Sequence, residues 1–274
     1  MDEDRKELIA ELEEKARRIR VLVVKVAGMS DCHTGGSLSM ADVIAALYFH
    51  IMNVDPENPD REDRDYFILS KGHTVPAVDA ALAMRGFFSE EALVTHLETD
   101  SIISGHACAR TTPGIDASTG SLGHGLSLGI GAALGIRMDK ASNRVFVVLG
   151  DGELQEGSNW EAAMAAAHHK LDNLTAIVDR NWYQTGPTEE MMALEPLADK
   201  WRSFGWATRR IDGHNMEEVV DALEGVPFEQ GRPSVVIANT IKGKGVSFIM
   251  NHHMARFDEN RLREALQELG EPVP

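Results

Sequence analysis

The sequence has little cysteine, little positive charge and no long apolar run, and each shortage excludes a class of protein. Cys32 and Cys108 are too few for a disulfide framework, and their spacing matches no metal-binding motif, so we expect a reduced, cytoplasmic protein. The 27 basic residues face 43 acidic ones, and the resulting net charge of −16 argues against a nucleic-acid partner or an anionic membrane surface. The apolar run 19–28 is interrupted by Lys25, which indicates a helix face rather than a signal peptide or a membrane span.

The chain is long enough to bury a large core in one domain. Its 274 residues are 43% hydrophobic and 26% charged, values typical of an ordinary globular protein. It contains no internal repeat, low-complexity tract or long linker. We therefore predict a single domain over residues 1–274.

Periodicity predicts alternating helices and strands. Apolar residues near a spacing of 3.6 indicate a long amphipathic helix over residues 4–29. Further helices are expected at 41–51, with Ser39 as the N-cap, at 126–138, where Gly129, Gly131 and Gly135 would allow close packing, and at 194–204 and 216–229. Short apolar runs predict strands at 66–69, 145–149, 174–178, 207–211 and 234–239. This alternation predicts an α/β fold with a doubly wound, mostly parallel sheet flanked by helices.

The strongest chemical signal lies at the ends of two of these strands. Gly150-Asp151-Gly152-Glu153 follows the strand 145–149, and its glycines let a ligand approach the main chain while the next helix offers N–H groups to an anion. That combination describes a diphosphate site. Asn181 follows the next strand thirty residues later, and both strand ends meet at one sheet edge. Asp151 and the amide oxygen of Asn181 are donors that suit Mg²⁺ or Ca²⁺.

Three histidines stand in glycine-bearing loops upstream. His33 begins the string H-T-G-G-S-L-S, His73 ends I-L-S-K-G-H, and His106 precedes T-P-G-I-D. The string S-T-G-S-L-G-H-G-L-S follows from Ser118. Each histidine alone could simply satisfy a backbone carbonyl.

In this order, these strings together resemble the amino-terminal half of transketolases over nearly the whole chain, from the first helix to about Phe248. The resemblance implies the thiamine diphosphate-binding fold, with thiamine diphosphate and Mg²⁺ as cofactors and Ca²⁺ or Mn²⁺ as substitutes for the ion. It implies that His33 and His106 contact the sugar and are catalytic. The cofactor-binding residues that it implies are His73, Gly120, Leu122, Gly150, Gly152, Glu153 and Asn181. The metal ligands that it implies are Asp151, Asn181 and the backbone carbonyl of Tyr183.

The resemblance also implies a reaction and a partner. Transketolases move a two-carbon ketol unit from a ketose to an aldose, and thiamine diphosphate holds the carbanion that no side chain can hold. Their catalytic glutamate lies on a pyrimidine-binding domain beyond the point where this chain stops. We therefore expect the amino-terminal subunit of a split transketolase, completed by a carboxyl-terminal subunit that carries this glutamate, in a heterotetramer with two copies of each chain.

Several alternatives stay open at this stage. Another thiamine-dependent enzyme, such as a deoxyxylulose-phosphate synthase or a 2-oxo acid dehydrogenase subunit, is a rival, and so is a non-catalytic scaffold. The sugar phosphate or analogue is not identified. By the resemblance, Glu156 lies near the subunit boundary.

The chain departs from the family at two places. Trp182 stands where a small residue is usual after the asparagine. The usual Trp-His-Gly after Lys242-Gly243-Lys244-Gly245 is missing, and His252, His253 or Arg256 is a candidate to replace its histidine.

Overall fold

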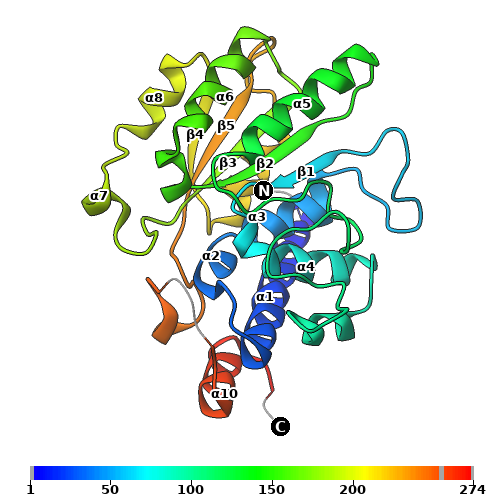
Figure 1. Cartoon of the computed structure of the whole chain (residues 1–274), viewed down its shortest axis with the longest axis vertical. Helices are drawn as coiled ribbons and strands as arrows, with labels where there is room; N and C mark the ends of the chain where they lie inside the picture. Colours follow the sequence, from blue (N-terminus) through cyan, green and yellow to red (C-terminus); the bar gives the residue numbers. More distant parts are fainter. Residues whose placement is uncertain (1–2, 253–255, 273–274) are drawn as a thin grey trace.

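A five-stranded parallel sheet forms the centre of the molecule (Figure 1). The computed structural model describes residues 3–252 and 256–272. The spatial order is β1-β2-β3-β5-β4, and the strands are β1 (Tyr66–Leu69), β2 (Val145–Gly150), β3 (Leu174–Arg180), β4 (Ala207–Asp212) and β5 (Ser234–Asn239). The register pairs Gly150 with Asp179, so the polar ends of β2 and β3 lie side by side.

Helices cover both faces of the sheet, which confirms the predicted doubly wound α/β architecture. One face packs against α1 (Glu3–Met29), α3 (Ala41–Ala46), α4 (Val75–Arg85) and α9 (Met216–Glu224). The other packs against α5 (Gly125–Met138), α6 (Gly157–His168) and α8 (Leu197–Ser203). Alternation along each strand supplies both cores: Phe146 of β2 enters the first and Val147 the second.

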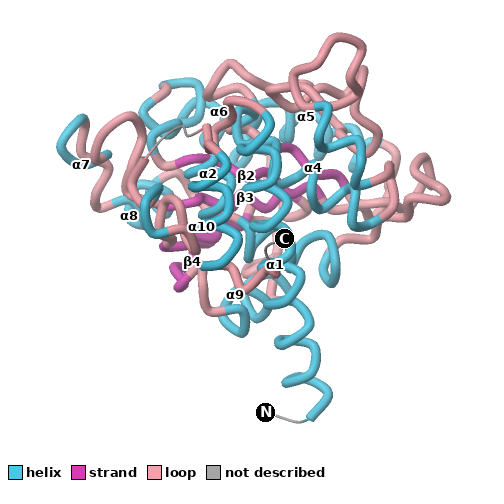
Figure 2. Tube along the Cα trace, turned by 90° about the horizontal axis from the view of Figure 1, so that it is seen from below, coloured by secondary structure: helices cyan, strands magenta, loops and turns pink. Residues whose placement is uncertain are grey.

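The remaining elements are short. They are α2 (Thr34–Ser39), a π-helical turn (Leu47–Ile51), α7 (Thr188–Met191), α10 (Glu259–Glu268) and the 3₁₀ turns Gly72–Thr74, Glu90–Thr95, Gly152–Gln155 and Ser247–Ile249. The acidic amphipathic helix expected after Phe257 is α10, which packs against α1 (Figures 1 and 2). The first turns of α1 project from the body (Figure 2). Across the described ranges, no helix has both the length and the apolarity needed to cross a bilayer.

One prediction about a helix end was wrong, and one helix changes type along its length. Ser39 does not cap α3, which begins after Met40; its hydroxyl donates instead to the Gly36 carbonyl and, at 2.7 Å, to Asp179 on β3. The helix expected at 41–51 is α-helical only to Ala46 and continues as the π-helical turn. Ser39 does not cap the helix because its hydroxyl bonds instead to Asp179, which is 140 positions later in the sequence.

Two further helices differ in their bounds from the prediction. The helix expected at 194–204 is α8, which begins at Leu197, and that expected at 216–229 is α9, which ends at Glu224. Of the three glycines on α5, Gly129 faces the sheet, where an added Cβ would lie 2.5 Å from Val147 Cγ2. Among the described residues, nothing lies within 4 Å of a Cβ added to Gly131 or Gly135, so close packing at these two stays a prediction.

Candidate active site

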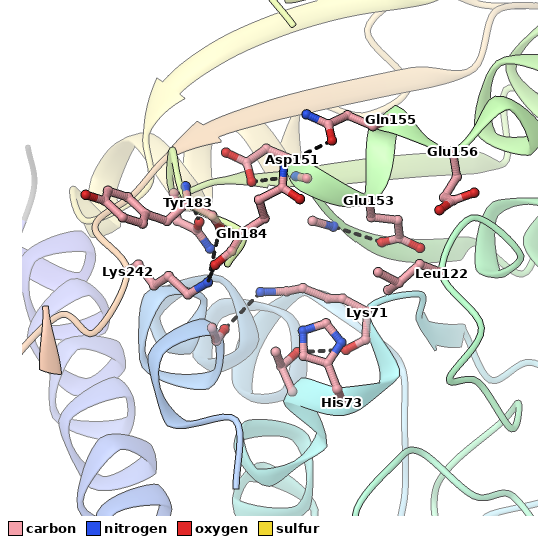
Figure 3. Close-up of a pocket in the computed structure, with 15 residues that line it drawn as sticks. Lys71, His73, Leu122, Asp151, Glu153, Gln155, Glu156, Tyr183, Gln184 and Lys242 are labelled. Carbon is pink, nitrogen blue, oxygen red and sulfur yellow. Dashed lines mark hydrogen bonds between the residues drawn. The ribbon is translucent and has the colours of Figure 1, made fainter. Parts of the chain in front are cut away.

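A cavity lies at the carboxyl edge of the sheet, beyond the ends of β1, β2 and β3 (Figure 3). Eight of the predicted site residues line it: His73, Leu122, Gly150, Asp151, Gly152, Glu153, Asn181 and Tyr183. The other three adjoin it. The His33 ring centroid is 4.8 Å from that of His73 and 6.1 Å from that of His106, and a Cβ on Gly120 would lie 3.3 Å from the His106 ring. The fold therefore gathers residues that lie far apart in the sequence.

The three histidines come from separate loops. His33 precedes α2, His73 lies in the turn after β1, and His106 lies in the loop between α4 and α5. Burial lowers the pKa of the His33 imidazole, and His106 and Lys242 lower it further through their charge. His33 is therefore neutral near pH 7 and can accept a hydrogen bond or a proton.

Asp151 is buried where β2 ends. Its Oδ2 accepts hydrogen bonds from Arg180 Nη1 at 2.8 Å and from the Trp182 backbone N–H at 2.7 Å, while its Oδ1 accepts from the Gly152 N–H at 2.7 Å. Burial raises the pKa of the Asp151 carboxyl, and the Arg180 guanidinium opposes part of that rise. The carboxylate is thus held in one orientation by its own chain.

Asn181 is oriented by Asp179, two residues before it on β3. Asp179 accepts from Lys71 Nζ at 2.5 Å and from Asn181 Nδ2 at 2.8 Å. Burial alone would raise the pKa of Asp179, but Lys71 and the hydrogen bonds outweigh it and hold that pKa below its usual range. Because the amide nitrogen faces Asp179, the amide oxygen faces the Tyr183 N–H, at 3.1 Å, on the cavity side of the loop.

The ammonium group of Lys242 lies at the Tyr183 backbone carbonyl, which is a predicted metal ligand. Its Nζ donates to the Tyr183 carbonyl at 3.2 Å and to the Gln184 carbonyl at 2.7 Å (Figure 3). Burial, with the neighbouring charge of Lys71, lowers the Lys242 pKa to about 8. The Tyr183 carbonyl, the predicted metal ligand, therefore accepts a hydrogen bond from the Lys242 ammonium.

The donor set around Asp151 fits a hard divalent ion. No three histidine, cysteine, aspartate or glutamate side chains converge as metal ligands within residues 3–252 and 256–272. Of the three predicted ligands, Asp151 is the charged one, and Asn181 and Tyr183 would offer uncharged oxygens. Such a set leaves positions for phosphate oxygens and water, as Mg²⁺ prefers.

Glu153 ties the Gly-Asp-Gly turn to two neighbouring loops. Its carboxylate accepts from the Ser70 hydroxyl and from the backbone N–H groups of Gly123 and Gly150, both at 2.9 Å. Burial raises the pKa of this carboxyl. The side chain lines the cavity and fixes the turn, and through Gly123 it also fixes the loop that carries Leu122.

Sequence reasoning missed three cationic side chains at this site. Lys71 follows β1 and Lys242 follows β5, so the rule that ligands bind beyond strand ends, already applied to His73, could have found them. Arg180 directly precedes the predicted ligand Asn181. Its pairing with Asp151 had no local signal, because the two residues are 29 positions apart.

The segment after β5 folds back over α2. Gly243 N–H donates to the Gly35 carbonyl at 2.9 Å, and an added Cβ on Gly35 would clash with the His252 carbonyl. His252 and Arg256 are exposed, and His253 lies outside the described residues. The residue that replaces the missing family histidine stays a prediction.

A shallow, mainly apolar hollow lies at Gly120, one of the predicted cofactor-binding residues. It is lined by Ser118, Thr119, Gly120, Ser121, His124, Ser127 and Leu128. Leu128 is 45% exposed, and Met138 further along α5 is 82% exposed. The chain therefore leaves apolar surface uncovered beside Gly120, one of the predicted cofactor-binding residues.

Comparison with known proteins gives the family. The model of the family "Transketolase, thiamine diphosphate binding domain" matches residues 12–272. The chain belongs to the transketolase family. It is 46% identical to the 6-deoxy-6-sulfo-D-fructose transketolase subunit SqwG of Clostridium sp. (strain MSTE9), over 94% of this chain and 96% of that relative.

Two further comparisons support this membership. The chain is 42% identical to an apulose-4-phosphate transketolase subunit of Phocaeicola vulgatus, over 96% of this chain and 94% of that relative. It superimposes on the transketolase from Leishmania mexicana with a TM-score of 0.89 at 27% identity. That match covers 95% of this chain but 41% of the Leishmania chain, so this member of the family spans about two fifths of that solved transketolase.

Proposed function

We propose that this transketolase-family chain is the amino-terminal subunit of a split enzyme that binds thiamine diphosphate and Mg²⁺ and transfers a two-carbon ketol unit. One observation carries the proposal. A single cavity combines the oxygen donors Asp151 and Asn181 with two buried lysines, and a group of histidines adjoins it. The first part suits a diphosphate with its cation, and the histidines suit a polyol.

The residues of the cavity divide by charge. Asp151, Asn181 and the Tyr183 carbonyl would hold the divalent ion. Lys71, Lys242 and His73 would face the diphosphate, since buried ammonium groups beside an anion form charge-assisted hydrogen bonds. Because the chain carries a net charge of −16, this local positive charge is what lets an anion bind.

The histidines would act on the sugar. When bound, thiamine diphosphate supplies the electron sink for cleavage of the carbon–carbon bond. His33 and His106 would donate and accept hydrogen bonds to sugar hydroxyls and move protons as the substrate adds and the product leaves. The lowered pKa of His33 keeps its imidazole available as an acceptor near neutral pH.

A partner chain would complete the site. The open hollow that includes Gly120 offers a place for a pyrimidine-binding domain, and Glu156, which lines the main cavity, is exposed. The partner would supply the catalytic glutamate and the apolar cover for Leu128. Two copies of each chain would form a heterotetramer.

The substrate would be a sugar phosphate or a close analogue. The two relatives from Clostridium and Phocaeicola are named for a sulfonated and a phosphorylated sugar, respectively. This chain supplies the histidines that face the ketol end, and we assign recognition of the anionic far end to the partner.

The test is a reconstitution. The chain is purified alone and with a candidate partner, and ketol transfer from sugar phosphates and sulfosugars is measured with thiamine diphosphate and Mg²⁺. Activity is expected only when both chains are present. Full turnover by the lone chain would contradict the proposal that the site is split between two chains. If the two chains assemble but show no activity over a broad substrate panel, the proposal of ketol transfer is contradicted.

A further inference from the structure

Arg180 is the most completely buried cation of the site and is bonded to three acidic side chains. Its side chain has no exposed area. Nη1 donates to Asp151, and Nη2 donates to Glu189 at 2.5 Å and to Glu195 at 3.4 Å. Arg180 therefore links the end of β2 to the segment that follows β3.

The Trp182 ring lies against the same guanidinium. The Arg180 Cζ is 3.7 Å from the centroid of the indole, a close cation–π contact. Trp182 has a φ of +67°, a left-handed conformation that a bulky residue rarely adopts. In this conformation its backbone N–H donates to Asp151 Oδ2. The stack thus holds in place the strained residue that contacts the carboxylate.

These contacts leave one coordination position on Asp151. A carboxylate has about four lone-pair positions, two on each oxygen. Arg180 and Trp182 occupy both positions on Oδ2, and the Gly152 N–H occupies one on Oδ1. A cation can then bind through the remaining position on Oδ1.

We propose that Arg180 and Trp182 form a clamp that positions Asp151 for one-oxygen ligation of the divalent ion. The inference rests on the proposed function, because it assumes that Asp151 binds that ion. It explains the bulky residue after β3: Trp182 is the partner of a buried arginine. Both are positioning residues, since neither touches the ion.

The experiment measures ion affinity with the chain assembled with its partner subunit. Mn²⁺, a spectroscopic substitute for Mg²⁺, is titrated into this complex at saturating thiamine diphosphate, and free Mn²⁺ is followed by electron paramagnetic resonance. Arg180→Met and Trp182→Ala are each expected to weaken Mn²⁺ binding by about tenfold or more, as loss of an orienting contact does at metal sites. Arg180→Lys is expected to restore part of the loss. The double variant is expected to lose less than the two single losses combined, because both act through one contact.

Arg210→Met is the matched control. Arg210 also pairs with Glu195, at 2.9 Å, but no bond joins it to Asp151 in the described structure. The Arg210→Met variant is expected to change Mn²⁺ affinity by less than about twofold, because Arg210 lacks the contact on which the clamp depends.

If Arg180→Met lowers the melting temperature but leaves Mn²⁺ affinity unchanged, the clamp is refuted. If Arg180→Met fails to fold, Trp182→Ala decides by the same criterion, since Trp182 is 39% exposed. Absence of Mn²⁺ binding in the wild type would overturn the proposed function and this inference with it.

Discussion

The amide nitrogen of Asn181 lies 2.8 Å from Asp179 Oδ2, and this one bond decides which atom of Asn181 is available to a ligand. Asp179 is itself anchored by Lys71 and Ser39. The predicted metal ligand is thus oriented by a neighbour on its own strand and by groups from two segments that are distant in sequence. Orienting partners of this kind commonly matter nearly as much as the ligands themselves.

Asp179→Ala should destabilise the fold strongly. It leaves the buried Lys71 ammonium without its carboxylate, and breaking a buried ion pair on one side costs about 3–5 kcal/mol. Unfolding in guanidinium chloride measures the loss. Asp199→Ala is the control, because it removes an exposed pair with Arg202 and should change little. Equal effects of the two substitutions would contradict the role of Asp179.

Asp151→Ala should abolish Mg²⁺-dependent retention of thiamine diphosphate. The substitution removes the one charged ligand of the proposed ion. Calorimetry on the assembled complex, with and without Mg²⁺, provides the measurement. Asp139→Ala, distant from the cavity at the end of α5, should retain the cofactor as the wild type does. Retention by Asp151→Ala at the wild-type level would remove Asp151 from the ion.

Lys242→Met should weaken cofactor binding by roughly tenfold to a hundredfold, the value of a charge-assisted hydrogen bond of about 1.5–3 kcal/mol. Because the Lys242 pKa is about 8, its ammonium loses the proton as the pH rises through that value. Wild-type affinity should therefore fall between about pH 7 and pH 9. Lys244→Met, in the same loop but not lining the cavity, should keep this pH dependence, whereas Lys242→Met should lack it.

His106→Ala should slow ketol transfer without weakening the cofactor. Loss of a positioned proton-transfer group typically lowers kcat/KM by about 10²–10⁴. The reconstituted complex gives kcat/KM, and a fluorescence titration gives the cofactor affinity. The exposed His168→Ala is the control. A parallel loss of activity and cofactor affinity would indicate that His106 supports the site rather than acting on the sugar.

His96 should make the fold sensitive to acid. It is buried, its Nδ1 lies 2.5 Å from the Ser30 hydroxyl, and its Nε2 has no partner among the described residues. Burial lowers the His96 pKa, and His33 lowers it further. The neutral form therefore contributes stability that is present above the unfolded-state pKa of about 6.5 and is lost as the pH falls below it.

The corresponding measurement is urea unfolding at pH 7 and pH 5. Asn at position 96 can still bond to Ser30 but does not titrate, so His96→Asn should reduce the loss of stability between the two pH values. The exposed His168→Asn should leave that loss unchanged. An identical pH dependence in all three proteins would exclude His96 as a source.

The sequence by itself determined the five strands, most of the helices and the residues that stand at strand ends, although it did not predict the helix α4. Hydrophobic periodicity and glycine turns are local, so the βαβ unit around Asp151 and Asn181 could be read directly from spacing. The parallel register then brings Gly150 beside Asp179. The same local rules predicted that His33, His73 and His106 lie in loops, which can reach the carboxyl edge of the sheet.

Tertiary structure alone decided how these side chains pair. Asp179 and Arg180 point to opposite faces of one strand, and each meets a partner from another segment: Lys71 for the first, Asp151 for the second. Ser39 turns from its own helix to Asp179, and Lys242 reaches the Tyr183 carbonyl. A polar group that is buried away from water needs a hydrogen-bond partner in the protein. Which groups are buried, and which partners they meet, is decided only when segments distant in sequence pack together.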